Sequence, residues 1–164
     1  MSSQVSFEFV ISVGVMLSLI SFIVITSERS VSRIEQQLLF EKKRAIAWQL
    51  SELFLSHPGY PRNWSDLNEV KVLGFSTGER GVFSLEKIMA INSCSPLEYE
   101  SLLDKLGLRE SSFVLSFYLI SEDGKIKLSE CSPPVISKLA SRAKITRLGV
   151  LENQSLIEME VVLY

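Results

Sequence analysis

The sequence predicts an α+β protein, in which a long N-terminal transmembrane helix packs by its C-terminal half on an antiparallel β-sheet head. The first observation is an uncharged, strongly apolar run from Phe9 to Ser27. Its nineteen residues would span about 28 Å as a helix, close to the hydrocarbon thickness of a bilayer. The second observation is helical periodicity that continues beyond Ile25 without Pro or Gly as far as His57. The third is a period of two from Ser112 onward, which is typical of strands.

The chain is expected to divide into a leader remnant (residues 1–3), a long helix (4–57) and a globular α+β head (58–164). Within the helix, residues 5–27 are apolar all round and residues 28–57 are amphipathic. A continuous helix from Gln4 to Ser56 would be roughly 80 Å long. We expect the apolar half to pack on lipid or on neighbouring helices, and the amphipathic half to pack on the head. One apolar stripe of this half consists of Leu39, Ile46, Leu50 and Leu53, and an adjoining stripe consists of Val31, Ile34 and Leu38.

Pro58 and Gly59 end the helix, because proline cannot continue it and a turn-rich loop follows. His57 is expected to cap the helix as a cation near the negative end of the helix dipole. Val70–Phe75 then predicts a short strand. Two helices are expected next, one that opens at Ser84 and one from Pro96 to Leu106, with Ser95 as its N-cap and Gly107 as its C′ residue.

Four antiparallel strands are expected in the remainder of the chain: Ser112–Ser121, Ile126–Cys131, Val135–Leu151 and Leu156–Tyr164. Tight turns at Glu122–Lys125 and Glu152–Ser155 divide them into two hairpins. Apolar residues alternate with polar ones along the strands, which predicts one buried and one wet face of the sheet.

The residue types give no indication of an enzyme, a cofactor or a metal site. His57 is the only histidine, and there is no nucleophile motif and no glycine-rich phosphate loop. The net charge of −2 gives no reason to expect a nucleic-acid partner. Lys42-Lys43-Arg44 alternates with glutamates along the helix, which favours a solvated face over a site for anionic lipid or DNA.

The chemical state of two pairs of residues in the head depends on whether the head is exported from the cytoplasm. Cys94 and Cys131 either form one disulfide in an exported head or remain two buried thiols, and the sequence leaves both alternatives open. Asn63 and Asn153 each begin an Asn-x-Ser glycosylation sequon in a predicted loop, which is relevant to an exported head.

The segment Gln4-Val5-Ser6-Phe7-Glu8-Phe9 resembles the Gln-x-Ser-x-Glu-Leu/Phe signature of archaeal type IV pilins and pilin-like proteins, which carry a class III (prepilin) signal sequence. Residues 59–64 together with 72–75 also resemble a segment of archaeal pilin-like proteins. The resemblance implies a pilin-like fold and cleavage by a prepilin peptidase between Ser3 and Gln4. It also implies that Gln4, Ser6 and Glu8 belong to the processing and assembly motif, with Glu8 placed near a neighbour's new α-amino group.

The function that the resemblance implies is a structural subunit, major or minor, of a surface filament used for adhesion. The partners would be copies of itself or other pilins, the peptidase, and membrane lipid before assembly, with the head finally outside the cell. One alternative is a single-span membrane-anchored protein with a small partner- or ligand-binding domain that does not polymerise. A third candidate is a filament-tip protein that binds DNA or surfaces.

The residues before Gln4 differ from the leaders of this family, which carry Lys or Arg and often end in Gly. Met1-Ser2-Ser3 has none of these, so Arg29 and Arg33 alone would place the head in the cytoplasm by the positive-inside rule. A start codon upstream of Met1, which would add basic residues to the leader, would reconcile the pilin-like motif with the positive-inside rule. We expect such a start.

Overall fold

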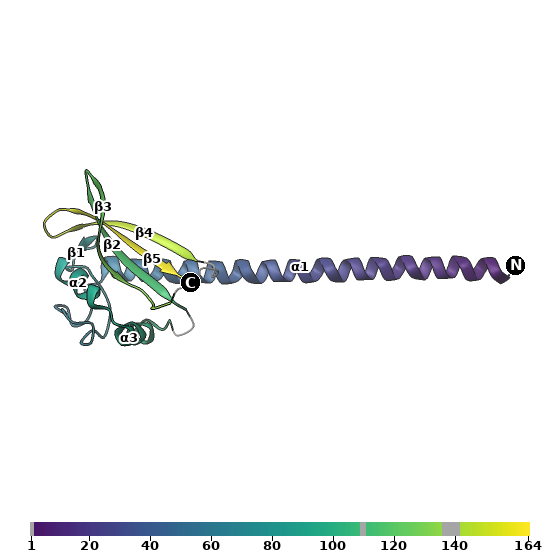
Figure 1. The fold of residues 1–164 in the computed structure, drawn as a ribbon, viewed down its shortest axis with the longest axis horizontal. Helices are drawn as coiled ribbons and strands as arrows, with labels where there is room; N and C mark the ends of the chain where they lie inside the picture. Colours follow the sequence, from purple (N-terminus) through teal and green to yellow (C-terminus); the bar gives the residue numbers. More distant parts are fainter. Residues whose placement is uncertain (1, 109–110, 136–141) are drawn as a thin grey trace. The chain divides into compact units, whose positions relative to one another are not determined.

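The computed structural model describes residues 2–108, 111–135 and 142–164, with the side chains of 2–6, 29, 30, 32 and 93 left aside. The chain forms two compact units, Met1–Leu39 and Phe40–Tyr164, which are considered separately. Helix α1 (Ser2–Ser56) extends through the first unit and into the second (Figure 1). Its length agrees with the helix expected from Gln4 to Ser56.

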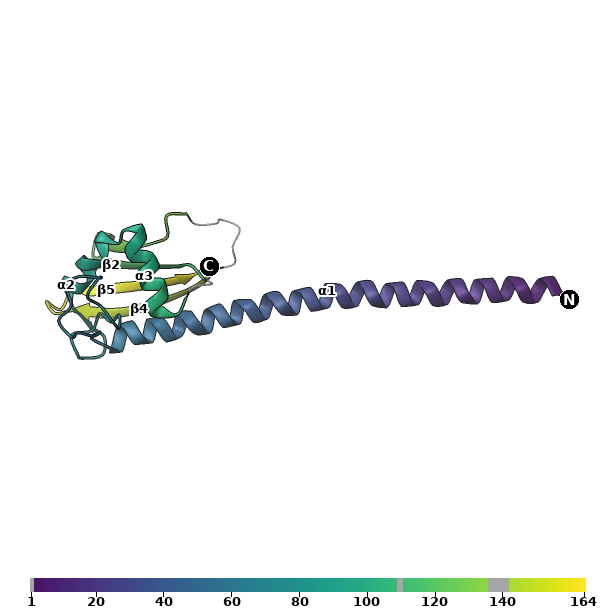
Figure 2. The same ribbon diagram turned by 90° about the horizontal axis from the view of Figure 1, so that it is seen from below.

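The last turns of α1 form part of the core of the second unit and run alongside its sheet (Figure 2). Ala47, Leu50 and Phe54 are at most 7% exposed, and their spacing of three and four residues places them on one helix face. On the opposite side of the core, Phe117 belongs to strand β2 (Phe113–Ser121). Phe75 lies between the helix and the sheet, with ring centroids 5.5 Å from Phe54 and 5.0 Å from Phe117.

The sheet has five strands in the order β1-β4-β5-β2-β3. The other strands are β1 (Val82–Phe83), β3 (Gly124–Cys131), β4 (Ala143–Leu151) and β5 (Leu156–Leu163). β2 to β5 pair antiparallel as expected, but β1 pairs parallel with β4, so the sheet is mixed and not purely antiparallel. Two residues are too few for alternation to be visible in the sequence. β4 begins at Ala143, later than expected, and residues 136–141 lie outside the described part of the chain.

The predicted strand at Val70–Phe75 is wrong. This segment makes a single bridge, between Val72 and Tyr60, and otherwise runs as loop. The N–H of Phe75 instead donates to the Phe54 carbonyl (3.2 Å), and the N–H of Gly81 donates to the Leu55 carbonyl (3.1 Å). The last carbonyls of a helix have no hydrogen-bond partner within the helix. The two loop N–H groups provide these partners, so α1 ends without a capping residue.

Gly74 explains why this loop can approach the helix end so closely. A Cβ at this position would lie 2.2 Å from the His57 carbonyl oxygen and 2.6 Å from the Gly59 nitrogen, both backbone atoms. Trp64 fastens the same loop, because its indole N–H donates to the Gly74 carbonyl (3.0 Å) and its side chain is 1% exposed. The turn-rich segment is therefore part of the core.

The helices of the head are α2 (Leu85–Ala90), the 3-10 helix η1 (Ile91–Ser93) and α3 (Pro96–Leu106). Ser84 stands at the N-cap of α2, but its side chain makes no capping hydrogen bond. Ser95 caps α3 as expected, because its hydroxyl accepts from the Glu98 N–H while the Glu98 carboxylate accepts from the Ser95 N–H (2.7 Å). Gly107 ends α3 in the left-handed region, with φ of 69°.

The reciprocal hydrogen bonds between Ser95 and Glu98 form a capping box. Its contribution to the stability of the head should depend on pH. Hydrogen bonds from Ser95, first from its backbone and then from its side chain, lower the pKa of Glu98. Its stabilising effect is therefore present above the unfolded-state pKa and is lost as the pH falls through the folded-state pKa. We expect Glu98→Gln to lower the free energy of unfolding by about 0.5 kcal/mol at pH 7, because glutamine can still accept the bond and only the negative charge near the helix N-terminus is lost. The loss should be much smaller in acid.

Urea unfolding at both pH values tests this expectation. Glu100→Gln is the matched control, because Glu100 is exposed on the same helix and takes no part in the capping box. An equal loss of stability in both variants, or a loss for Glu98→Gln that persists unchanged in acid, would contradict the assignment.

Candidate functional site: the apolar N-terminal helix

The predicted processing residues lie in the first turns of α1. The backbone of Ser3, Gln4 and Ser6 is helical, and the side chains of these residues lie outside the described part of the structure. Glu8 is described, is exposed, and stands at the beginning of the apolar run. Cleavage between Ser3 and Gln4 stays a prediction.

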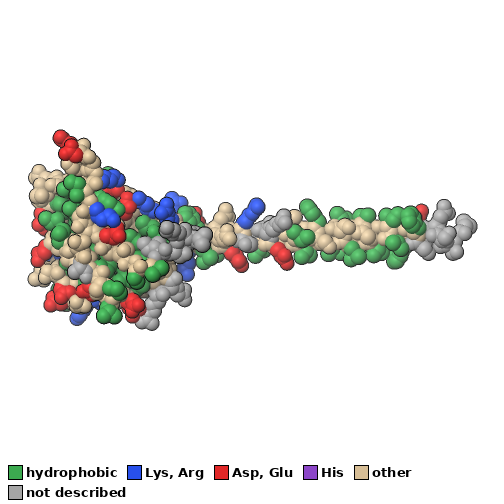
Figure 3. Space-filling model, in the orientation of Figure 1, with side chains coloured by type: hydrophobic (Ala, Val, Ile, Leu, Met, Phe, Trp, Pro, Cys, Tyr) green, Lys and Arg blue, Asp and Glu red, His purple; other side chains and the backbone are tan. Residues whose placement is uncertain are grey.

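Among the described residues, α1 is the one helix that is long and apolar enough to cross a membrane. Its large apolar side chains from Phe7 to Ile25 are between 38% and 69% exposed within the single chain (Figure 3). Soluble monomers rarely leave a contiguous apolar surface of more than a few hundred Å² in water. This surface therefore requires lipid or protein around it.

Two hydroxyl groups within the apolar run bind carbonyls of their own helix. The Ser18 hydroxyl donates to the Gly14 carbonyl (2.8 Å), and the Thr26 hydroxyl donates to the Phe22 carbonyl (2.8 Å). Such bonds remove the cost of placing a hydroxyl in lipid or against an apolar helix. A Cβ at Gly14 would have no atom within 4 Å, so this glycine leaves a notch on the helix surface. Small residues of this kind allow another helix to approach closely.

The apolar residues in the amphipathic half of α1 are divided between the two units. Ile46, Leu50 and Leu53 join the core of the second unit. Val31, Ile34, Leu38 and Leu39 are instead between 54% and 70% exposed. These four residues belong to the first unit, where they form a second exposed apolar surface beyond the apolar run.

A disulfide joins Cys94 to Cys131, with the Cα atoms 5.4 Å apart. Cys94 follows η1 and Cys131 is the last residue of β3, which forms one edge of the sheet. The bond therefore fastens an edge strand to the helical segment. This is one of the two alternatives that the sequence leaves open.

Both glycosylation sequons lie on loops, and both asparagines are exposed. Asn63 follows the end of α1, and Asn153 lies in the turn between β4 and β5. The Asn153 side-chain oxygen accepts from the Ser155 N–H (3.1 Å). Modification of either residue stays a prediction.

Among the described contacts, the His57 side chain does not bind a carbonyl of the last turn of α1. Its Nδ1 accepts a hydrogen bond from the Gly59 N–H (2.9 Å), in the loop that follows the helix. The loop amides described above bind the helix carbonyls in its place. The expected role fails because the carbonyls of the last turn already have backbone donors.

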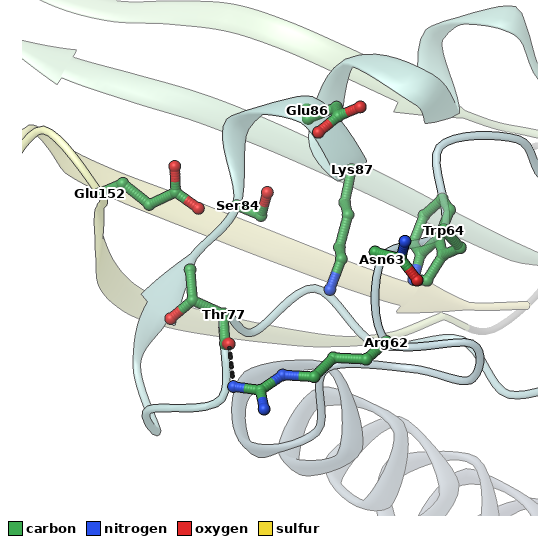
Figure 4. A pocket seen from close by; sticks show the side chains of 8 residues that line it. All are labelled: Arg62, Asn63, Trp64, Thr77, Ser84, Glu86, Lys87 and Glu152. Atoms are coloured by element: carbon green, nitrogen blue, oxygen red, sulfur yellow. Dashed lines mark hydrogen bonds between the residues drawn. The ribbon is translucent and has the colours of Figure 1, made fainter.

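Sequence reasoning missed a polar pocket of about 380 Å³ in the head. Eight residues line it: Arg62, Asn63, Trp64, Thr77, Ser84, Glu86, Lys87 and Glu152. They come from the loop after α1, from the beginning of α2, and from the β4–β5 turn (Figure 4). No local pattern joins such distant segments. The nearest signal was Lys87, a charged residue directly before the buried Ile88.

Within the described residues, no group of three or more His, Cys, Asp or Glu side chains is placed to hold a metal ion. Comparison of the chain with protein-family models, with curated proteins and with solved structures finds no match.

Proposed function

We propose that the chain is a structural subunit of an archaeal type IV pilus-like surface filament, used for attachment and assembled through α1. The observation that carries the proposal is the apolar surface from Phe7 to Ile25, whose large side chains are exposed among the described residues. In the membrane lipid would surround it, and in a filament the same helices of other subunits would do so.

Three features of α1 favour a filament over a simple membrane anchor. Glu8 stands at the entrance of the apolar run, where a carboxylate in an apolar environment needs a cation or hydrogen-bond donors. The α-amino group of Gln4, exposed by cleavage in a neighbouring chain, would be such a cation. Gly14 provides a point of close helix contact. The exposed stripe of Val31, Ile34 and Leu38 extends the apolar surface beyond the length that a bilayer needs.

The alternative is a single-span anchored protein whose head binds a ligand or partner without polymerising. The polar pocket in the head favours this alternative specifically, because a purely structural head has no need of it. The two functions differ in what must happen at the N-terminus, since only filament assembly requires the chain to be cut before Gln4.

The N-terminus of the native protein therefore tests the proposal. We expect mass spectrometry of the protein from its own host to find Gln4 as the first residue. We also expect external protease to digest the head on intact cells. An anchored protein would keep the residues before Gln4, and a cytoplasmic head would be protected from the protease. Either result would contradict the filament proposal.

A further inference from the structure

The polar pocket of the head has a rigid frame. Trp64 forms one wall and is fixed by its bond to the Gly74 carbonyl. Arg62 is held across the loop, because its Nη2 donates to the Thr77 carbonyl (3.0 Å). A Cβ at Gly78 would meet the same nitrogen, so the glycine leaves room for the guanidinium in this position.

Lys87 is a buried cation that lines the pocket. It is 5% exposed, and its ammonium donates to two neutral carbonyl groups, those of Pro58 (2.6 Å) and Ser76 (3.1 Å). An ammonium has three N–H groups, and within the described residues Lys87 forms no ion pair with a carboxylate. Burying a charge without a counter-ion is costly. Figure 4 shows the side chain reaching from α2 toward the loop that carries Thr77 and Arg62.

The charges around the pocket limit the ligand that would fit. Arg62 and Lys87 supply two positive charges, which favour an anionic group. Glu86 and Glu152 line the same pocket and oppose a ligand with more than one negative charge, while they accept hydrogen bonds from hydroxyl groups. Asn63, Thr77 and Ser84 add further polar atoms. The volume of 380 Å³ lies near the lower end of the range for small-molecule sites, about 300–1,000 Å³.

We propose that this pocket binds an acidic sugar, a hexuronate unit of a polysaccharide. Its carboxylate is held by Arg62 and Lys87, and its hydroxyl groups bond to the carboxylates and to the neutral polar side chains. The site lies entirely within the second unit of the chain, so the proposal does not depend on polymerisation.

Titration of the full chain in detergent micelles tests the proposal, with protein made in a host that does not glycosylate Asn63. Glucuronate, glucose and inorganic phosphate are added separately and followed by calorimetry. We expect glucuronate to bind at least about tenfold more tightly than glucose, which lacks the carboxylate, and than phosphate, whose second charge the two glutamates repel. Absence of glucuronate binding, or equal or tighter binding of either other probe, would overturn the proposal.

Two variants and the pH dependence sharpen the test. Arg62→Gln is expected to weaken glucuronate binding about tenfold, and Arg142→Gln is the matched control, an exposed arginine outside the pocket. Burial, followed by the charge of Arg62, lowers the pKa of Lys87, while Glu152 and Glu86 act in the opposite direction. A bound carboxylate favours the charged amine, so affinity for glucuronate should fall as the pH rises through this lowered pKa. Unchanged binding in Arg62→Gln, or no loss of affinity in alkali, would overturn the assignment.

Discussion

Replacing Cys94 and Cys131 together by serine is expected to lower the free energy of unfolding of the head by about 4 kcal/mol. The two residues are 37 positions apart, and cross-linking them removes the entropy of closing that loop from the unfolded chain. This is a large part of the stability of a small domain, which is usually about 5–15 kcal/mol. The edge strand β3 should open first, because the bond is its covalent link to the helical segment.

Denaturant unfolding of the full chain in detergent, followed by tryptophan fluorescence, measures this loss. Both tryptophans, Trp48 and Trp64, lie in the second unit, and Trp64 is 1% exposed. The matched control is the wild-type chain with its disulfide reduced, which isolates the cross-link from the effect of burying serine at position 131. We expect the reduced wild type to lose most of the 4 kcal/mol. Equal unfolding midpoints for the oxidised and reduced wild type would contradict the prediction.

The sequence predicts those helices and strands whose formation and ends are determined by residues within or directly beside the element. α1 is predictable because no Pro interrupts residues 2–56 and its apolar run has no charge. α3 is predictable because Ser95, Pro96 and Gly107 mark both of its ends. β4 is predictable because buried or half-buried residues alternate with exposed ones along it. β2 and β5 are predictable because they are rich in Val, Ile, Leu and Phe, and β3 because it follows β2 across a tight turn.

The parts that escape prediction depend on contacts between distant segments. The loop from Val70 to Phe75 has the composition of a strand, but its backbone binds the end of α1. The disulfide depends on a Cα distance, which no spacing along the chain reveals. The pocket joins Arg62 to Lys87 and Glu152, and these residues come together only when the β4–β5 turn meets the loop after α1.

Glu8→Gln is expected to lower the yield of surface filaments at least about tenfold, while insertion of the chain into the membrane is unchanged. Glu8 is exposed in the single chain, so its loss costs the isolated subunit little. In the proposed filament the same carboxylate would be surrounded by apolar helices and paired with a neighbour's α-amino group. A charge-assisted bond of this kind is about twice as strong as a neutral one, and it is repeated at every subunit added. Glutamine keeps the size and removes the charge.

Glu28→Gln is the matched control, because Glu28 is the next acidic residue along α1, is also exposed, and lies at the other end of the apolar run. It is expected to leave the filament yield close to that of the wild type. The two pools are compared by immunoblot of sheared surface material and of the membrane fraction. Glu8→Gln should shift the chain from the first pool to the second, since only assembly requires the neighbour's amine. Equal losses in both variants would show that acidic charge on α1 acts non-specifically. Filaments at the wild-type level in Glu8→Gln would show that this carboxylate faces solvent or its own helix terminus, and assembly would then rest on apolar packing alone.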